Sequence, residues 1–189
     1  DKLNGKGVAY CSICDAPLFK DKIAAVIGGG NAGLEAVVDL LPYAGKIYLL
    51  IRSEKIKGDP VIQEQIKVSS KAEIIFNADT KEILGDKFVS GLKYVDLKSG
   101  EEKELKLDGV FVEIGAEPNS KIAEGLVKIN EWKEVMIDHR TGATSQPGIF
   151  AAGDVTDVKY KQNNVSAGDA IKAALSAYEY LMSGQNKLK

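Results

Sequence analysis

The sequence predicts an α/β fold, and three neighbouring features near its start are the reason. A continuous apolar run at Ile23–Ile27 has the length of a strand buried on both faces of a parallel sheet. A G-x-G-x-x-G loop follows at residues 28–33, and apolar residues then recur with helical spacing. This order is typical of a Rossmann-like three-layer nucleotide-binding domain.

The next segments extend this βαβ unit. A helix is expected at residues 31–41 and is ended by Pro42, and a second strand is expected at residues 47–51. Asp59 is the expected N-cap of a further helix, with Pro60 in its first turn.

The middle of the chain is rich in predicted strands. Residues 73–76 form a third predicted strand of the parallel sheet. Segments separated by hairpin turns, at 82–84, 88–95 and 104–107, predict an antiparallel β insertion. Residues 109–115 form another predicted buried strand.

The pattern changes after residue 117, where we expect the boundary between a domain at 1–117 and one at 118–189. The second segment has these expected elements: a short helix at 122–127, strands at 134–137 and 149–152, and a final helix from about 166 to 182.

The composition excludes several classes of partner. Apolar residues make up 44% and charged residues 28% of the 189 residues, and the formal net charge is −2. No basic excess suggests nucleic acid, no apolar run approaches the length of a membrane span, and no secretory signal pattern stands at the start. The first methionine is Met136, so we expect an excised piece of a longer protein.

The only two cysteines, Cys11 and Cys14, form a C-x-x-C motif that is directly followed by Asp15. A structural zinc site normally takes four Cys or His ligands, and the single histidine, His139, is distant, so no metal site is predicted. A redox pair in a reducing cytoplasm is the favoured interpretation, with two inert core cysteines as the alternative. Asp15 can donate or accept a proton when the pair is reduced or oxidised.

The glycine-rich loop predicts a dinucleotide site. Gly28, Gly30 and Gly33 permit a tight turn and a close approach of the backbone to a pyrophosphate. The helix that begins at Asn31 offers free N–H groups to the phosphates. The alternative is a tight strand–helix turn that binds nothing.

The residues after the second strand bear on the choice of nucleotide. NAD-specific sites usually place Asp or Glu there, whereas this chain has Arg52 and, further on, Lys57. Both could neutralise a 2′-phosphate, so we predict a preference for NADPH. NADH stays an alternative nucleotide, because Glu54 could accept a hydrogen bond from a ribose hydroxyl. A second alternative is that Arg52 and Lys57 are only exposed surface groups.

Together these motifs resemble the bacterial-type, low-molecular-weight thioredoxin reductases and the related flavoprotein subunit of alkyl hydroperoxide reductase. The resemblance covers essentially the whole chain in colinear order. It adds Gly115 to the expected nucleotide-binding residues. The matching segments are residues 9–15, 26–31, 114–119, 148–155, 160–162 and 166–168.

The resemblance implies FAD as a second cofactor. Gly153 and Asp154 are then expected to hold its ribityl–phosphate side. Lys161, Gln162 and a helix that begins near Ala167 are expected to lie against the flavin ring, where a helix N-terminus stabilises negative charge. Residues beyond the domain boundary are then the C-terminal part of a second, FAD-binding Rossmann-like domain.

The resemblance also implies roles for the dithiol. Cys14 is expected to be the flavin-proximal sulfur, Cys11 the interchange thiol that attacks the partner disulfide, and Asp15 the acid–base group. The implied path runs from NADPH through FAD to the Cys11–Cys14 disulfide, and on to thioredoxin or a thioredoxin-like protein. The resemblance also implies that the two nucleotide domains rotate against each other, with hinges expected near residues 1–7 and 118–119. A homodimer is a further implication.

Two departures limit the resemblance. The family begins with a further strand–GxGxxG–helix unit for FAD that is not in this sequence, so the 189 residues alone are expected to be inactive. The second departure is at Arg52-Ser53, where thioredoxin reductases usually carry a fuller arginine pair. Residues 160–162 and 175–178 are more similar to the alkyl hydroperoxide reductase branch, which leaves the disulfide partner open. The alternative functions are therefore the flavoprotein of a peroxiredoxin system and a redox-inactive nucleotide-binding module.

Overall fold

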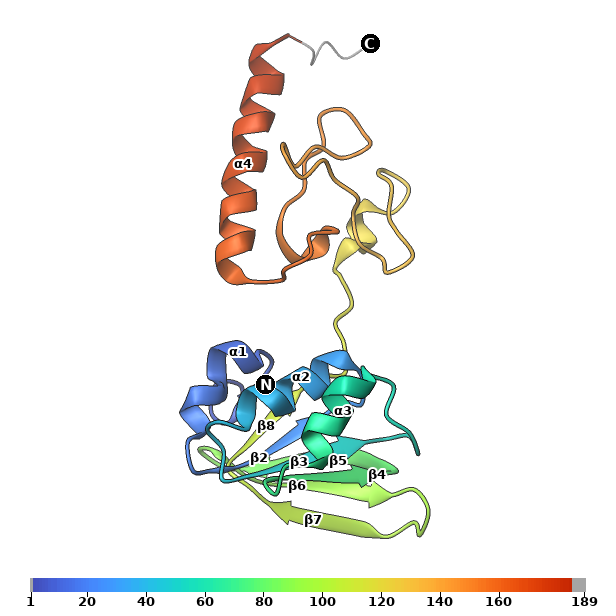
Figure 1. Cartoon of the computed structure of the whole chain (residues 1–189). Helices are drawn as coiled ribbons and strands as arrows, with labels where there is room; N and C mark the ends of the chain where they lie inside the picture. Colours follow the sequence, from blue (N-terminus) through green and yellow to red (C-terminus); the bar gives the residue numbers. More distant parts are fainter. Residues whose placement is uncertain (1, 185–189) are drawn as a thin grey trace. The chain divides into compact units, whose positions relative to one another are not determined.

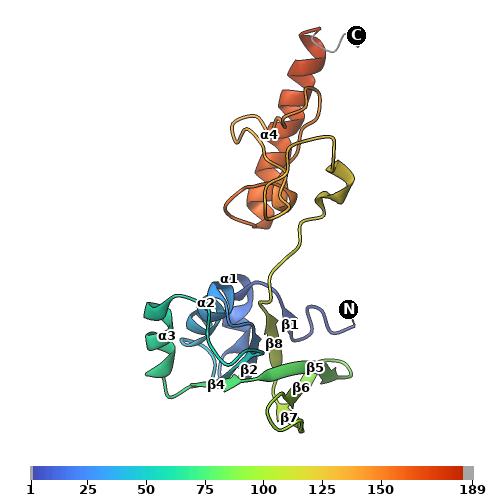
Figure 2. The same ribbon diagram turned by 90° about the vertical axis from the view of Figure 1, so that its right-hand side faces the viewer.

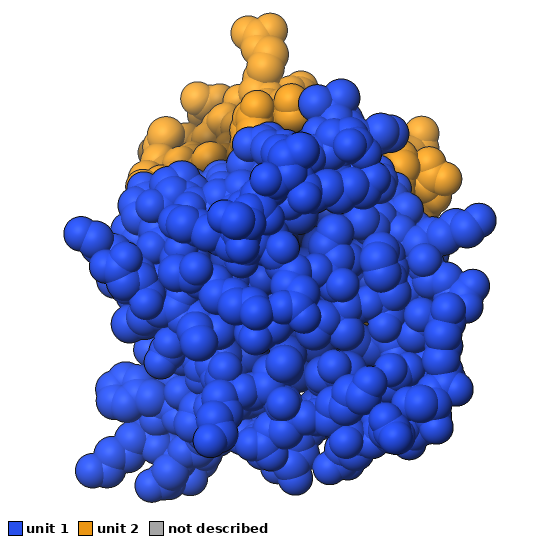
Figure 3. Space-filling model, turned by 60° about the horizontal axis from the view of Figure 1, so that its bottom comes forward, with its two compact units in different colours: residues 1–115 blue, residues 116–189 orange. Residues whose placement is uncertain are grey.

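The computed structural model describes residues 2–184 of the chain, which divides into two compact units (Figure 1). Unit 1 is Asp1–Gly115 and unit 2 is Ala116–Lys189, drawn in separate colours in Figure 3. Unit 1 contains both sheets, and unit 2 is built around one long helix.

Unit 1 is based on a five-stranded parallel sheet with the strand order β1-β8-β2-β3-β4. Its strands are β1 (Val8–Ala9), β2 (Ile23–Ile27), β3 (Lys46–Ile51), β4 (Ala72–Phe76) and β8 (Gly109–Val112). β2 is central and pairs with β3 on one side and β8 on the other. Open α/β sheets bind ligands in the crevice where the strand order reverses, which here is the carboxyl end of β2.

Helices cover one face of this sheet, as Figure 1 shows. They are α1 (Ser12–Asp15), the short 3₁₀ turn η1 (Ala16–Phe19), α2 (Asn31–Leu40) and α3 (Pro60–Lys67). Ala24, Val26 and Phe111 of the sheet are buried in one cluster with Leu34 and Val37 of α2. The apolar stripe of α2 is therefore what holds the helix layer on the sheet.

A three-stranded antiparallel sheet lies on the face opposite to α2 and α3 (Figure 2). It comprises β5 (Ala78–Gly85), β6 (Val89–Asp96) and β7 (Glu102–Lys106). The alternate residues Ala25, Leu50 and Val110 of the parallel sheet pack on this side with Leu92 and Tyr94 of β6. Unit 1 thus has three layers, which confirms the predicted α/β fold with an antiparallel insertion.

The predicted start of α3 is confirmed. The N–H group of Val61 donates a hydrogen bond of 2.7 Å to Oδ1 of Asp59, and Pro60 occupies the first helical position. An aspartate cap satisfies an N–H group that has no partner inside the helix. The local sequence alone therefore determines where this helix begins.

The hydroxyl of Thr80 in β5 is buried and has no hydrogen-bond partner within residues 2–184. Because burial of an unpaired hydroxyl is costly, Thr80→Val is expected to raise the free energy of unfolding of unit 1 by about 1 kcal/mol in urea denaturation. Thr156→Val is the matched control, since the buried Thr156 hydroxyl donates to the carbonyl oxygen of Gly153 at 2.7 Å. That variant should destabilise unit 2, and a loss of stability in Thr80→Val would contradict the prediction.

Unit 2 contains α4 (Asn163–Met182), the 3₁₀ turns η2 (Ser120–Ala123) and η3 (Gly153–Val155), and loops joined by isolated β-bridges. The loops pack closely on α4. A Cβ at Gly142 would lie only 2.8 Å from the Cβ of Ala173, so this contact requires glycine. No helix within the described residues is long and apolar enough to cross a membrane.

Some expected elements of unit 2 differ from the structure. The helix expected at residues 122–127 is replaced by the shorter turn η2, and the strands expected at 134–137 and 149–152 form only isolated bridges. Each segment meets its neighbour at single residue pairs, such as Val135 with Thr156. Apolar runs of this length become regular strands only where a neighbour offers a continuous ladder.

The last helix also begins earlier than expected. α4 begins at Asn163, because Gln162 already has the extended conformation of an N-cap and its carbonyl accepts the Ser166 N–H at 2.9 Å. Ala167 therefore lies in the second turn of α4 and not at its start. The Ser-Ala-Gly-Asp run suggested a helix start by composition, but its serine is already inside the helix.

Candidate functional site

A pocket of about 970 Å³ lies at the carboxyl ends of β2, β3 and β8 in unit 1. Its size is within the usual range for cofactor sites. Its walls are the glycine-rich loop, the segment after β3, residues 78–83 of β5 and the residues after β8. The predicted binding residues that line it are Gly28, Gly30, Asn31, Arg52, Lys57 and Gly115. Within the described residues, Gly33 does not belong to this lining.

The glycines of the loop have two different functions. A Cβ at Gly28 would lie 2.2 Å from the carbonyl oxygen of Glu113, and one at Gly33 would lie 2.1 Å from that of Gly28. Packing inside the protein therefore requires both. A Cβ at Gly30 would meet no atom within 4 Å, so the space that it would fill belongs to the pocket. The loop fits a ligand that approaches the backbone closely at Gly30, as a pyrophosphate does.

The N-terminus of α2 lies at this pocket. Gly30 is the N-cap of α2, and in the described part of the chain no side-chain hydrogen bond caps the helix. The first N–H groups of a helix have no partner within the helix, and its dipole favours a negative charge there. This end of α2 can therefore hold an anionic group of a ligand.

Two hydrogen bonds fasten the glycine-rich loop to the segment after β3. The N–H of Lys57 donates to the carbonyl of Gly29 at 2.9 Å, and the N–H of Asp59 donates to Oδ1 of Asn31 at 2.8 Å. These bonds bring Lys57 to the pocket. They also give Asn31 a bridging role that its place in the motif does not indicate.

The cation Arg52 is paired with an acid from another strand. Its Nε lies 3.2 Å from Oδ1 of Asp79 in β5, and Nζ of Lys81 lies 2.5 Å from Oδ2 of the same carboxylate. The hydrogen bond from Lys81, opposed by burial and helped by the charge of Arg52, lowers the pKa of Asp79. Asp79 and Lys81 both line the pocket. Sequence reasoning missed them because nothing local signals that β5 passes the end of β3.

The sequence suggested Glu54 as a possible acceptor for a ribose hydroxyl of NADH. Among the described residues, Glu54 is not part of the pocket lining. Its Oε1 lies 3.3 Å from Nζ of Lys98, and both side chains are largely exposed. The Glu54 carboxylate therefore belongs to a surface ion pair and not to the pocket.

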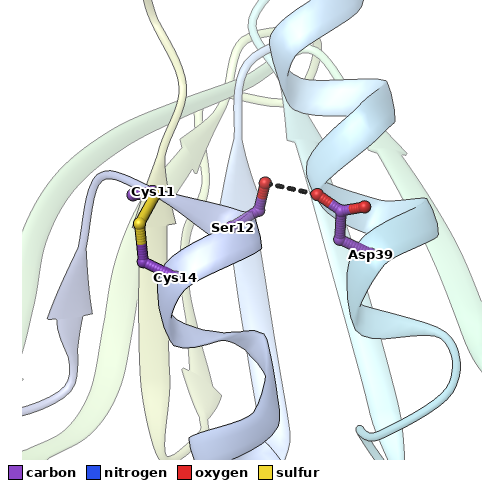
Figure 4. The surroundings of a disulfide bond; sticks show 4 residues. All are labelled: Cys11, Ser12, Cys14 and Asp39. Atoms are coloured by element: carbon purple, nitrogen blue, oxygen red, sulfur yellow. Dashed lines mark hydrogen bonds between the residues drawn. A yellow bond between two sulfur atoms is a disulfide. The ribbon is translucent and has the colours of Figure 1, made fainter. Parts of the chain in front are cut away.

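The two cysteines form a disulfide at the start of α1, with their Cα atoms 5.3 Å apart (Figure 4). Cys11 is half-buried and Cys14 is exposed, so they are not inert core residues. Asp15 is half-buried at the end of α1. The predicted pair is therefore linked and, at Cys14, accessible to solvent.

A hydrogen bond that the sequence did not suggest anchors this disulfide. Oγ of Ser12, between the cysteines, donates to Oδ2 of Asp39 in the last turn of α2 at 2.7 Å (Figure 4). The bond fastens the four-residue helix α1 to α2. The residues are 27 positions apart, and only the packing of α1 beside α2 brings them together.

Glu113 adds a titratable group to the edge of the pocket. It follows β8 and lines the pocket, and its N–H donates to the carbonyl of Ile27 at 2.9 Å. Burial, and then the negative charges of Asp39 and Glu35, raise the pKa of Glu113 to about 7. No local pattern indicates this shift, because the two α2 acids approach Glu113 only in the folded unit.

The raised pKa of Glu113 makes stability depend on pH. Its usual value is 4.5, so the folded state binds the proton more tightly than the unfolded state. The resulting stabilisation is complete below the unfolded pKa and is lost as the pH rises through the folded value. After a discount for partial exposure, unit 1 should lose about 1–2 kcal/mol between about pH 5 and pH 8.

The measurement is urea denaturation at both pH values. Glu113→Gln should remove this part of the pH dependence because glutamine stays neutral throughout. Glu64→Gln is the control, since the Glu64 carboxylate is exposed and forms a surface ion pair with Lys67 of the same helix. An unchanged pH dependence in Glu113→Gln would show that the carboxyl group titrates in its ordinary range.

In unit 2, the residues predicted for FAD lie around η3 and the start of α4. Gly153 has a φ of 77°, which favours glycine. Oδ1 of Asp154 accepts a hydrogen bond of 3.1 Å from Oγ of Ser166 in α4. Gln162 is the N-cap residue of α4, and within residues 2–184 its side chain makes no capping hydrogen bond to this helix. The uncapped helix end beside Asp154 fits an anionic ligand group.

Lys161 is held by its own unit. Its ammonium group donates to the carbonyl oxygens of Asp154 and Thr156 and lies 2.8 Å from Oε1 of Glu134. It therefore joins η3 to the loop that carries Glu134. Ala167 is exposed in the second turn of α4, which corrects the expectation that it marks the helix start.

Metal-binding side chains are not gathered in the described part of the chain. Within residues 2–184 no group of three or more His, Cys, Asp and Glu side chains is arranged to hold a metal ion.

Comparison with curated proteins shows close relatives of greater length. The chain is 46% identical over 181 residues to a protein named NADH dehydrogenase from Bacillus subtilis, a match that covers 96% of this chain and 35% of that protein. It is 46% identical over 182 residues to a subunit of alkyl hydroperoxide reductase from Staphylococcus epidermidis, a match that covers 96% of this chain and 36% of that protein. The chain thus spans about a third of the length of these relatives.

Comparison with solved structures gives a thioredoxin reductase-like fold. The thioredoxin reductase of Streptococcus pyogenes matches with a TM-score of 0.85 and 30% identity, over 94% of this chain and 58% of that one. The thioredoxin reductase of T. acidophilum matches with a TM-score of 0.66 and 39% identity, over 94% and 59%. The family model described as pyridine nucleotide-disulphide oxidoreductase matches residues 1–174. The chain belongs to the pyridine nucleotide-disulphide oxidoreductase family.

Proposed function

We propose that this chain is the nucleotide-binding and dithiol-bearing part of a flavoprotein disulfide reductase. The reductase passes electrons from NADPH via FAD to the Cys11–Cys14 disulfide and on to thioredoxin or a thioredoxin-like protein. One observation carries this proposal. The pocket at the glycine-rich loop, with open space at Gly30, and the solvent-accessible C-x-x-C disulfide belong to the same compact unit. Because the chain spans about a third of its curated relatives, the activity is assigned to a full-length protein.

The nucleotide is assigned to the pocket of unit 1. The uncapped N-terminus of α2 and the open space at Gly30 are assigned to its pyrophosphate. Arg52 and Lys57 are assigned to a 2′-phosphate, because both line the pocket and are positively charged. Gly115, where a Cβ would also meet open space, forms the wall after β8.

FAD is assigned to unit 2, with Gly153, Asp154, Gln162, Lys161 and Ala167 as the residues proposed to hold it. When bound, FAD supplies a carrier that takes a hydride from the nicotinamide and passes two electrons to a disulfide. The uncapped start of α4 favours negative charge on a group beside it. Lys161 keeps η3 in place through its two carbonyl contacts.

The dithiol is proposed to work through two exchange steps after it is reduced. Reduction breaks the Cys11–Cys14 bond with two electrons and two protons and leaves two thiols. Cys11, as a thiolate, attacks the partner disulfide, forms a mixed disulfide and releases one partner thiol. Cys14 then attacks Cys11 in that mixed disulfide, which releases the second partner thiol and re-forms the Cys11–Cys14 bond. Asp15, directly after Cys14, is assigned to proton transfer.

A specific observation favours the peroxiredoxin system as the alternative acceptor. The chain is 46% identical to a subunit of alkyl hydroperoxide reductase, against 30% and 39% to the two thioredoxin reductase structures. In this alternative, the same relay delivers electrons to a peroxiredoxin or its thioredoxin-fold carrier. The chemistry of the dithiol is unchanged, and only the protein that it reduces differs.

The test uses a full-length protein loaded with FAD. It is mixed with NADPH, or in a parallel assay with NADH, and either thioredoxin or a peroxiredoxin with its carrier, and oxidation of the nucleotide is followed by absorbance. We expect turnover with one of the two acceptors and none when the 189-residue chain replaces the full-length protein. Lack of oxidation of both NADPH and NADH with both acceptors would overturn the proposal in favour of a redox-inactive module. Turnover by the 189 residues alone would overturn the need for further FAD-binding residues. Sedimentation of the same sample tests the proposed homodimer.

A further inference from the structure

Arg52 is not a free cation at the nucleotide pocket. Its side chain is 78% exposed, yet its Nε lies 3.2 Å from Oδ1 of Asp79, whose side chain is only 19% exposed. Asp79 comes from β5, on the antiparallel sheet, and lines the same pocket as Arg52 and the glycine-rich loop. The pocket therefore holds, in contact with Arg52, an acid that the sequence did not suggest.

The acid usually expected at this place is absent from the end of β3. An acidic residue there accepts hydrogen bonds from the ribose hydroxyls of NAD. Here Arg52 and Ser53 follow β3, and the Ser53 hydroxyl donates to the carbonyl of Lys55 at 2.7 Å. Glu54 pairs with Lys98 outside the described pocket lining. Asp79 is thus a carboxylate that contacts the residue following β3 from within the pocket.

We propose that Asp79 determines nucleotide specificity by acting against Arg52: it accepts a ribose hydroxyl of NADH and repels the 2′-phosphate of NADPH. This inference rests on the proposed function of the pocket as a pyridine nucleotide site. The inference adds that the site can accept both NADH and NADPH. The attraction of Arg52 and the repulsion of Asp79 for the 2′-phosphate together set which nucleotide is preferred.

The electrostatics of the group support this role. A 2′-phosphate that binds Arg52 must share the guanidinium with Asp79 and lies close to a second negative charge. Lys81, which holds Oδ2 of Asp79, partly offsets that charge but is itself a further partner for a phosphate. The hydrogen bond from Lys81 lowers the pKa of Asp79, so the carboxylate stays ionised throughout the neutral range. The charge of Asp79 itself therefore does not change with pH near neutrality.

The experiment measures binding and needs no turnover. The 189-residue chain is titrated calorimetrically with AMP and with adenosine 2′,5′-bisphosphate, which differ only in the 2′-phosphate. Asp79→Asn should shift the affinity ratio toward the bisphosphate by about tenfold, as expected for one partly screened charge. Arg52→Met should shift the ratio the other way. The inference is overturned if the affinity ratio of bisphosphate to AMP in Asp79→Asn stays within about twofold of the ratio in the unchanged chain. A twofold change is far below the effect expected for the loss of one charge.

Glu54→Gln is the matched control, since it removes a carboxylate two residues after Arg52 that lies outside the described pocket lining. It should leave the ratio unchanged, and a loss of AMP affinity in Glu54→Gln but not in Asp79→Asn would assign the ribose to Glu54 instead. If the unchanged chain binds neither ligand, the nucleotide site and this inference fall together. If it binds both and only the Asp79→Asn shift is missing, the proposed function stands and the inference alone fails.

Discussion

Gly30→Ala is expected to abolish tight nucleotide binding while leaving unit 1 folded. The added methyl group meets no protein atom within 4 Å and enters the space in which a pyrophosphate would approach the start of α2. We expect a loss of about 100-fold in affinity, the value of one or two charge-assisted hydrogen bonds. The cost in folding should be at most about 1 kcal/mol, because φ is −92° at Gly30 and alanine is only a poorer N-cap. Calorimetric titration with NADPH and NADH, with urea denaturation of the same sample, measures both effects.

Gly33→Ala is the contrasting variant. Its methyl group would lie 2.1 Å from the carbonyl oxygen of Gly28, so the strand–helix turn must shift. We expect it to lower the free energy of unfolding by about 2–4 kcal/mol, as overpacking in a rigid site does. Nucleotide affinity that is unchanged in Gly30→Ala would mean that the loop is only a tight turn and that the ligand site lies elsewhere.

Cys14→Ser in the full-length protein is expected to stop disulfide reduction, with a loss of at least about 1000-fold because the two thiols act as one unit. The variant leaves Cys11 as the only thiol of the motif. Cys11 should then form a mixed disulfide with the acceptor protein that no second thiol resolves. Mass spectrometry under non-reducing conditions should show this adduct in high yield.

Cys11→Ser tests the assignment of the two sulfurs. It should also stop turnover, but it should trap far less acceptor, because Cys14 is assigned to the flavin side. Within unit 1, Cys14 is exposed and Cys11 is half-buried, so accessibility in this unit alone favours the opposite assignment. If Cys11→Ser instead forms more mixed disulfide with the acceptor protein than Cys14→Ser does, Cys14 is the interchange thiol and Cys11 the flavin-proximal sulfur. Full activity of Cys14→Ser would contradict the dithiol mechanism.

The elements that the sequence predicts well are those with strong local signals. The apolar run of β2, the glycines after it and the Asp59-Pro60 start of α3 each act through neighbouring residues, and the structure has them where predicted. The strands expected in unit 2 had weaker support. Val135 bridges only single partners there, and whether an apolar run becomes a strand depends on neighbours that its own sequence does not specify.

The site was predictable only where one segment forms it. The glycine-rich loop, Arg52 and Lys57 could be found because they belong to one βαβ unit and the segment that directly follows it. Asp79 reaches Arg52 from β5, and the acids that perturb Glu113 lie on α2. Such contacts depend on how layers pack against each other, and no spacing in the sequence encodes them.

The hydrogen bond between Ser12 and Asp39 constrains how the reactive groups can move. α2 begins at the nucleotide pocket and reaches Asp39 eight residues after Asn31, a helical rise of about 12 Å. The glycine-rich loop and the short helix α1, which carries the disulfide, are thus both attached to α2. The pocket lining within residues 2–184 contains none of residues 11–15. Any rotation of unit 1 displaces the two groups by the same rigid-body operation, so their separation is conserved. In the proposed reductase, we therefore expect hydride delivery and thiol exchange at different moments, because the nucleotide pocket and the disulfide occupy different places on unit 1.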